Sequence, residues 1–82
     1  MRRRMVTVNL YAAARASVGK SSMKVNSGTL RHILKEITDK HPDIERVLQA
    51  SSFLVNGLVS HDLDQEIAPA SSIDVLPKFA GG

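Results

Sequence analysis

Residues 29–41 of the chain read TLRHILKEITDKH and carry its clearest helical pattern. The apolar residues follow the spacing of one face of an α-helix and are Leu30, Ile33, Leu34 and Ile37. Thr29 is a residue type that caps the N-terminus of a helix, and Pro42 disfavours a helix beyond His41. The pattern predicts one amphipathic helix, whose apolar face has to pack on neighbouring segments.

Two strands are predicted before this helix. Residues 5–11 read MVTVNLY, in which apolar and polar side chains alternate as in a strand with one buried face. Residues 22–26 read SMKVN and alternate in the same way. The Ala-rich stretch 12–18 and the turn residues 19–21 connect them, so we expect the two strands to form a hairpin.

A second hairpin is predicted after the helix. Residues 43–50 indicate another short helical turn, and residues 53–55 (FLV) indicate a strand. The dipeptide Asn-Gly at 56–57 is typical of a two-residue hairpin turn, and residues 58–59 lead away from it as the returning strand. Residues 61–72 are mostly polar and predict a loop.

The last predicted strand is residues 73–76 (IDVL), which end at Pro77. This order of strands with one main helix favours an α+β fold. A β-grasp, ubiquitin-like arrangement fits it best, with a mixed sheet packed on the helix and the first and last strands adjacent and parallel. A chain of 82 residues supports a single core. We expect a basic N-terminal arm over residues 1–4, the β-grasp domain over 5–77 and a flexible C-terminal tail over 78–82.

Composition narrows the classes of partner. The formal net charge is +3, but the three arginines at positions 2–4 supply that excess and leave eight basic against eight acidic residues. One Tyr and two Phe are too few for the aromatic platforms that stack on single-stranded nucleic acid. No stretch approaches the roughly 20 apolar residues of a membrane span. We therefore expect neither nucleic acid nor a membrane as a partner.

The residues that most often hold metals are sparse. There is no cysteine, and the three histidines, His32, His41 and His61, lie far apart in the sequence. Without thiolates, and without closely spaced acidic residues around the histidines, the sequence predicts no metal site and no cofactor bound by this chain. The lack of cysteine fits a reducing compartment, so we expect a cytoplasmic protein.

Strand alternation leaves a few apolar side chains outside the predicted core. If the alternating apolar residues of the first and last strands face the helix, then Tyr11 and Leu76 face away from it. Leu58, just after the hairpin turn, can extend this pair. A cluster of exposed apolar side chains marks a binding surface, whereas each one taken singly fits packing under a loop equally well. These three residues are the candidate partner-binding residues.

Three stretches, in this order and at these distances, resemble the small subunit of molybdopterin synthase: LYAAARASVG at 10–19, FLVNGLVSHD at 53–62 and IDVLPKFAGG at 73–82. The resemblance covers nearly the whole chain after the first arginines. More broadly, the chain is similar to the ubiquitin-like sulfur-carrier families, which share a β-grasp fold and a C-terminal Gly-Gly. It departs from the family pattern at Ala16, at residues 70–72 and at Lys78.

The resemblance implies that the reactive group is the C-terminal carboxylate of Gly82. Terminal carboxyl groups have a pKa of about 3.5, so at neutral pH they are anions and poor electrophiles. The family's chemistry implies that a ubiquitin-activating-like enzyme adenylates Gly82 with ATP, and that a persulfide donor then converts it to a thiocarboxylate. Gly81 has no side chain to block a narrow channel. Ala80, Phe79 and Lys78 are then the tail residues that contact the partner enzymes.

The same resemblance implies a hetero-oligomer with the large subunit of molybdopterin synthase. That subunit would hold the catalytic side chains and use two such sulfurs to build the dithiolene of molybdopterin from cyclic pyranopterin monophosphate. This chain is then a rechargeable co-substrate. Two alternatives stay open: a sulfur carrier for another pathway (thiamine, cysteine or tRNA thiolation), and a ubiquitin-like modifier that forms isopeptide bonds through Gly82.

Overall fold

The computed structural model describes residues 4–78, and its secondary structure runs from Met5 to Pro77. The strands are β1 (Met5–Leu10), β2 (Ser22–Asn26), β3 (Gly28–Thr29), β4 (Ser51–Val55), β5 (Leu58–Ser60), β6 (Glu66–Ile67) and β7 (Ser72–Pro77). The helices are α1 (Ala12–Val18), α2 (Leu30–Lys40), the 3₁₀ turn η1 (Pro42–Ile44) and α3 (Glu45–Gln49). The predicted tail residues 79–82 and most of the predicted basic arm lie outside the described residues.

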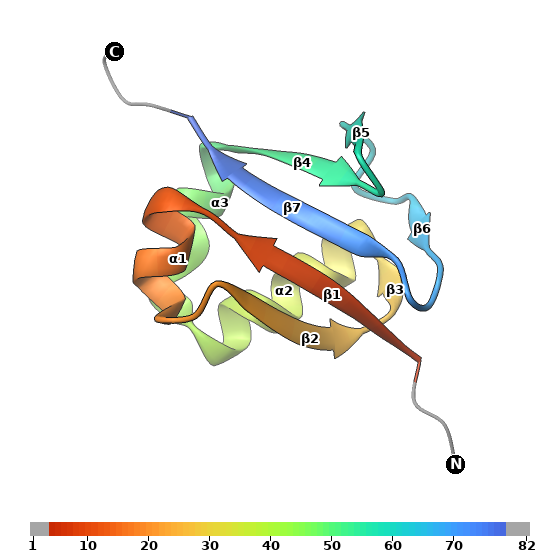
Figure 1. Cartoon of the computed structure of the whole chain (residues 1–82), viewed down its shortest axis with the longest axis horizontal. Helices are drawn as coiled ribbons and strands as arrows, with labels where there is room; N and C mark the ends of the chain where they lie inside the picture. Colours follow the sequence, from red (N-terminus) through yellow and green to blue (C-terminus); the bar gives the residue numbers. More distant parts are fainter. Residues whose placement is uncertain (1–3, 79–82) are drawn as a thin grey trace.

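Five strands form one mixed sheet in the order β2-β1-β7-β4-β5 (Figure 1). β1 and β7 pair in parallel, with Leu10 opposite Val75, and the other neighbouring strands pair antiparallel. The first and last strands of the chain are therefore adjacent and parallel, as the sequence predicts. This places the carboxyl ends of β1 and β7 at the same end of the sheet.

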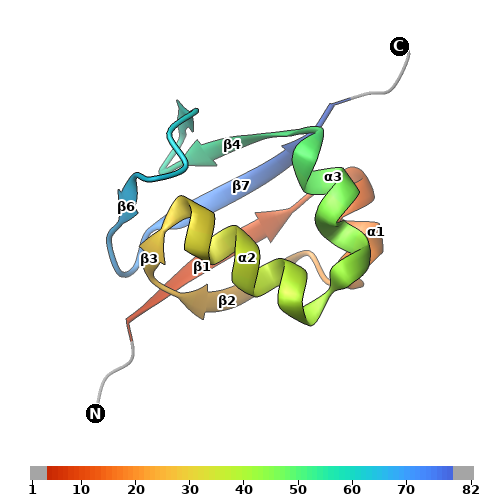
Figure 2. The same ribbon diagram turned by 180° about the vertical axis from the view of Figure 1, so that it is seen from behind.

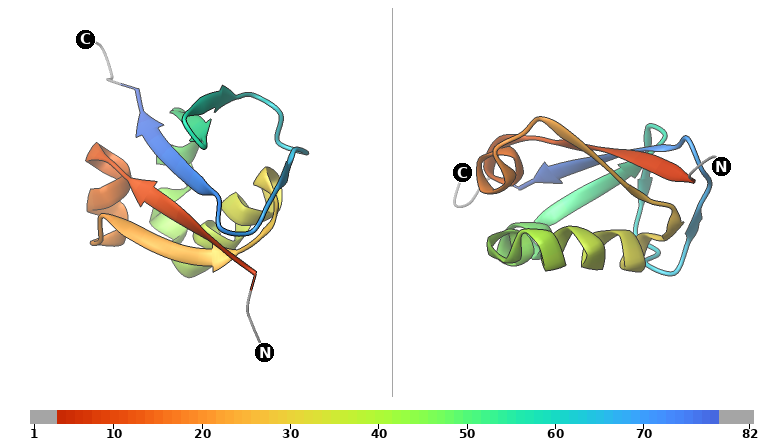
Figure 3. Two further views of the ribbon diagram at one scale, coloured as in Figure 1. Left: turned by 45° about the vertical axis from the view of Figure 1, so that its right-hand side comes forward. Right: turned by 90° about the horizontal axis from the view of Figure 1, so that it is seen from below.

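Helices α2 and α3 cover one face of this sheet, which we call the inner face (Figures 2 and 3). α1 lies at the end of the sheet where β1 ends. Among residues 4–78, no helix lies over the opposite, outer face (Figure 3). None of the described helices is long and apolar enough to cross a membrane. The sheet thus has one covered face and one open face.

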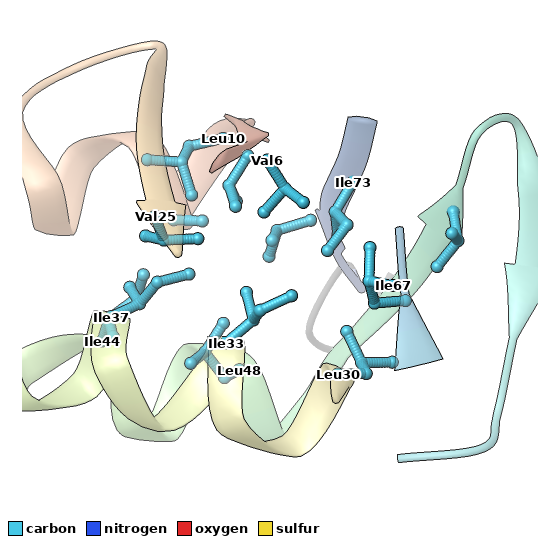
Figure 4. Close-up of a cluster of buried hydrophobic side chains, with 14 residues drawn as sticks. Val6, Leu10, Val25, Leu30, Ile33, Ile37, Ile44, Leu48, Ile67 and Ile73 are labelled. Carbon is cyan, nitrogen blue, oxygen red and sulfur yellow. The ribbon is translucent and has the colours of Figure 1, made fainter. Parts of the chain in front are cut away.

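Apolar side chains from the inner face and the helices meet in a single core (Figure 4). Its fourteen buried members are Val6, Val8, Leu10, Ala14, Val25, Leu30, Ile33, Ile37, Ile44, Leu48, Val55, Ile67, Ile73 and Val75. Full burial of one such side chain stabilises the fold by about 1.5–3 kcal/mol. The alternation predicted for the first and last strands is confirmed, because every apolar residue expected to face the helix is buried.

The main helix α2 forms where its pattern predicts. The Thr29 hydroxyl accepts a hydrogen bond from the backbone N–H of His32 at 3.1 Å, which satisfies one of the free donors at the helix start. The helix ends at Lys40, and Pro42 begins η1. Three of the four predicted apolar positions are buried, and Leu34 is half-buried at the margin of the core.

The Asn-Gly turn fixes the register of β4 and β5. Asn56 and Gly57 both have positive φ, 50° and 87°, as a two-residue hairpin turn requires. Val55 is therefore opposite Leu58, and Leu54 is opposite Val59. On the other side of β4, Leu54 is opposite Asp74 of β7.

Three short elements differ from the sequence prediction. Residues 12–18, predicted as a connection, form α1, so the paired strands β1 and β2 are joined through a helix and not by a tight turn. Only Ala14 of α1 is buried, and the Tyr11 side chain makes no cap hydrogen bond, so neither periodicity nor a cap signals this helix. The predicted loop 61–72 contains β6, which pairs with β3 over two residues each. Such short strands are below the length at which alternation can be detected.

Candidate functional site

The chain leaves the sheet at the carboxyl end of β7, a central strand. The backbone N–H of Lys78, the residue after β7, donates a hydrogen bond to the carbonyl of Ala50 at 2.9 Å. The chain is therefore still attached to the sheet at Lys78, the last described residue. Gly81 and Gly82 follow within four residues, outside the described part of the chain. Four extended residues span roughly 14 Å, which is the distance that the predicted reactive carboxylate can reach from Lys78.

Two of the predicted partner-binding residues lie together at this exit. Tyr11 keeps an extended backbone (φ −125°, ψ 154°) directly after Leu10, whose parallel partner is Val75. Tyr11 therefore comes level with Leu76 on the neighbouring strand, and the alternation turns both side chains to the outer face. Tyr11 is 44% exposed and Leu76 is half-buried. The exit of the chain is thus bordered by an aromatic and an aliphatic side chain.

The third predicted residue, Leu58, lies elsewhere. It is opposite Val55, and cross-strand partners share a face of the sheet. Because Val55 belongs to the core, Leu58 is on the inner side of the hairpin, where it is 75% exposed. The register also puts it level with Ile73 near the start of β7, away from Leu76. The structure therefore does not bring Leu58 together with Tyr11 and Leu76.

Instead, two other apolar residues extend the outer face. Leu54 of β4 is half-buried, and Val59, opposite it on β5, is 59% exposed. Leu76 is diagonal to Leu54, because it pairs with Ser52 two residues earlier in β4. Both residues could have been predicted from the sequence. The Asn-Gly turn at 56–57 implies that residue 54 pairs with residue 59, and Leu54 faces outward because both of its neighbours in the strand face inward.

A polar network lies in the same row of the outer face. Asn9 Nδ2 donates to Asp74 Oδ1 at 2.8 Å and to Ser72 Oγ at 3.1 Å. Asp74 is flanked across the strands by Asn9 and Leu54. We call the set Tyr11, Leu54, Val59, Asp74 and Leu76 the outer patch.

A groove of about 460 Å³ lies on the helix side, between α2, α3 and β4. Its floor is apolar and includes Leu34, Leu48 and Phe53. Two cations on its rim are already paired with carboxylates of this chain, Arg31 with Asp64 and Lys35 with Asp39, each at 3.1 Å. Among residues 4–78, no group of three His, Asp or Glu side chains is close enough to hold a metal ion. The groove therefore offers an apolar surface with no reactive group at its floor.

No family model and no curated protein matches the chain. Solved structures do match its fold. Small archaeal modifier protein 1 (SAMP1) from Methanosarcina acetivorans superposes with a TM-score of 0.85 at 21% identity, covering 100% of both chains. A chain of the Amycolatopsis orientalis BexX/CysO complex superposes with a TM-score of 0.80 at 24% identity, covering 94% of this chain and 99% of that one.

A third similar structure is a chain of the protein–protein complex of subunits 1 and 2 of molybdopterin-converting factor from Helicobacter pylori 26695. Its TM-score is 0.70 at 18% identity, and the match covers 95% of this chain and 99% of that one. All three likenesses are below 25% identity and extend over almost the entire chain on both sides. Together with the parallel β1–β7 pair and the helices on one face, they show that this chain has the ubiquitin-like β-grasp fold.

Proposed function

We propose that this protein is a sulfur carrier that bears sulfur as a thiocarboxylate on Gly82. The acceptor pathway that we propose is molybdopterin synthesis, in which the chain is the small subunit of molybdopterin synthase and cyclic pyranopterin monophosphate receives the sulfur. The main support for the proposal is the position at which the chain leaves the sheet. β7 ends beside the outer patch, and Gly-Gly follows Lys78 within reach of a protein docked on that patch.

The proposed chemistry needs an activation step, because a carboxylate does not react with a sulfur nucleophile. A carboxylate oxygen of Gly82 attacks the α-phosphate of ATP, and pyrophosphate leaves. The persulfide sulfur of a donor then attacks the acyl carbon and displaces AMP, and a thiol cleaves the remaining S–S bond to leave the thiocarboxylate. Gly81 and Gly82 suit these steps because neither presents a side chain to the attacking groups.

Two partner proteins follow from this scheme: an adenylating enzyme of the ubiquitin-activating kind, which uses ATP, and the synthase large subunit, which supplies the catalytic side chains. The complexes that contain the Helicobacter pylori and Amycolatopsis orientalis neighbours support the idea that a chain of this fold works with a second protein. We assign the docking of such partners to the outer patch, with Lys78, Phe79 and Ala80 as contacts along the tail. The reaction is proposed to take place in the cytoplasm.

A second candidate is supported by the likeness to SAMP1, which is a small archaeal modifier protein. In that case the activated Gly82 acyl group is transferred to a lysine amine of another protein and forms an isopeptide bond. Activation by adenylation is common to both candidates, so the difference lies in the nucleophile that receives the acyl group.

One experiment separates the candidates. The purified chain, ending at Gly82, is incubated with ATP, the adenylating enzyme of the same genome and a persulfide donor, and its intact mass is measured. A sulfur carrier gains about 16 Da as one oxygen is replaced by sulfur. Transfer of that sulfur to cyclic pyranopterin monophosphate by the purified large subunit supports the molybdopterin pathway. No gain in mass, together with lysine conjugates of the chain in cells, would instead support the modifier.

A further inference from the structure

The outer patch contains one charged side chain among apolar ones. Asp74 lies on β7, the third of the five strands, and its side chain is half-buried. Leu54 is opposite it on β4, and Leu76 is two residues further along the same face of β7. Val59 extends the apolar surface beyond Leu54. A protein that covers these apolar side chains must also cover the Asp74 carboxylate.

No cation of the described chain pairs with Asp74. The three ion pairs among residues 4–78 join side chains of α2 to one another or to Asp64. The strand pattern puts two lysines on the outer face, and neither contacts Asp74: Lys24 is opposite Thr7 on the edge strand, and Lys78 is four residues beyond Asp74. The carboxylate therefore keeps its charge available to a docking protein.

Asn9 holds the carboxylate in one orientation. Its Nδ2 donates to Asp74 Oδ1 at 2.8 Å, and the second bond of this amide, to Ser72 Oγ at 3.1 Å, fixes the amide itself. An ionised carboxylate has about four acceptor sites on its two oxygens, so this contact leaves Oδ2 and part of Oδ1 for another donor. The geometry is suited to a group that donates two hydrogen bonds at once.

Covering this carboxylate with an apolar surface would be unfavourable, because a buried charge loses its hydration and gains no partner in return. A cation from the docking protein removes that cost. Arginine fits better than lysine, because the planar guanidinium forms two parallel bonds to a carboxylate and packs its flat face and aliphatic stem against apolar side chains. The flanking leucines provide such a surface.

We propose that Asp74 binds an arginine of the protein that docks on the outer patch, and that Asn9 is the positioning residue for this contact. This inference rests on the proposed function, because it takes the adenylating enzyme as the docking protein. The inference also explains specificity. Apolar contacts provide affinity for the partner, and a protein whose apolar surface has no cation opposite Asp74 binds more weakly, because it leaves the carboxylate unpaired.

The test measures the KM of the carrier in the loading reaction with the adenylating enzyme. Asp74→Asn keeps the shape and the folded state, which a thermal unfolding curve checks, and removes the charge. We expect KM to rise about 30-fold with little change in kcat, because the contact serves binding and is desolvated in the complex. The matched control is Asp43→Asn, which removes the same charge from an exposed site in η1 on the helix side and should leave KM within about twofold.

Two further measurements distinguish a specific pair from a general charge effect. The KM of the wild-type chain should rise with salt more steeply than that of Asp74→Asn, because one ion pair is lost in the variant. Asn9→Ala should raise KM by less than Asp74→Asn does, and it should add nothing in the Asp74→Asn background. A structural role of Asn9 would raise KM equally in both backgrounds.

The outcomes separate this inference from the proposed function. If the wild-type chain is loaded and Asp74→Asn has a KM within twofold of it, the sulfur-carrier function stands and the Asp74 contact is refuted. If the wild-type chain itself never gains sulfur, the proposed function fails and the inference fails with it.

Discussion

The inner face of the sheet is mostly apolar where it meets α2 and α3, although Ser51 lies on it and donates a hydrogen bond to the carbonyl of Val47 in α3. The outer face mixes leucine, valine and tyrosine with aspartate, asparagine and serine. On the inner face, every second residue of β1, and Ile73 and Val75 of β7, are buried against the helices. On the outer face, the intervening residues keep part of their surface exposed, and a hydrogen-bonded Asn9–Asp74 pair lies among them. The same alternating strands thus present two different sets of side chains. One set maintains the fold, and the other forms the surface on which we propose that a partner protein docks.

The largest expected difference between the faces is in stability. Ile33→Ala on α2 should lower the free energy of unfolding by about 2–5 kcal/mol, because it leaves a cavity in a fully buried site. Val59→Thr on the outer face keeps the β-branched shape and should change the same quantity by less than about 0.5 kcal/mol. Urea denaturation followed by circular dichroism measures both. Equal losses of unfolding free energy would mean that the outer face stabilises the fold as much as the core does.

The next largest effect concerns recognition. The double variant Leu54→Thr and Val59→Thr removes apolar surface from the outer patch. It should raise the KM of the loading reaction about tenfold, because docking then buries less apolar area. The urea midpoint should fall only slightly. Lys35→Ala on the exposed side of α2 is the matched control. An unchanged KM in the double variant would show that these two residues do not belong to the docking surface.

The turn at 56–57 fixes which side chains of β5 lie on each face. If β5 shifted by one residue against β4, its inward-facing and outward-facing side chains would be exchanged. Gly57 has φ 87°, and a Cβ there meets no atom within 4 Å, so Gly57→Ala acts through the backbone alone. It should cost about 1 kcal/mol of unfolding free energy. Gly57→Asn should cost less, because asparagine tolerates positive φ. Hydrogen exchange of the β4 and β5 amides would show whether the loss is local, and equal stability of all three chains would contradict the account.

The smallest expected effect belongs to the exposed ion pairs of α2. Lys35 Nζ lies 3.1 Å from Asp39 Oδ2 one helical turn away, and both side chains are largely exposed. Removing the pair by Lys35→Ala should change the unfolding free energy by less than about 0.5 kcal/mol. A thermal unfolding scan at low and high salt checks this. A loss as large as that of Ile33→Ala would show that surface charge, and not the inner face, sets the stability.

Much of the fold follows from local patterns. The α2 periodicity, the alternation in β1 and β7 and the Asn-Gly turn each act over a few residues, and each predicts its element correctly. The helix α1 and the β3–β6 pair could not be predicted in this way. The only buried residue of α1 is Ala14, and β3 and β6 form because the loop after β5 brings Ile67 against Gly28. Their formation depends on packing contacts between distant residues.

The placing of the candidate site residues was predictable only in part. The alternation predicts that Tyr11 and Leu76 turn outward, and both keep exposed surface. Leu58 was predicted because it follows the turn, but the hairpin register places it on the inner side. The pair Asn9 and Asp74 is separated by 65 positions, so only the parallel pairing of β1 with β7 brings the two side chains together. That register is a property of the folded sheet and is not visible in either strand alone.

The central proposal is that the chain carries sulfur on the carboxyl group of Gly82. The most direct measurement is tandem mass spectrometry of the chain after incubation with ATP, the adenylating enzyme and a persulfide donor, beside a chain that lacks Gly82. The account predicts a gain of about 16 Da confined to fragments that contain Gly82, and no gain in the shortened chain, which should unfold at the same temperature because no core residue is changed. Sulfur found on another residue, or an equal gain in the shortened chain, would contradict it.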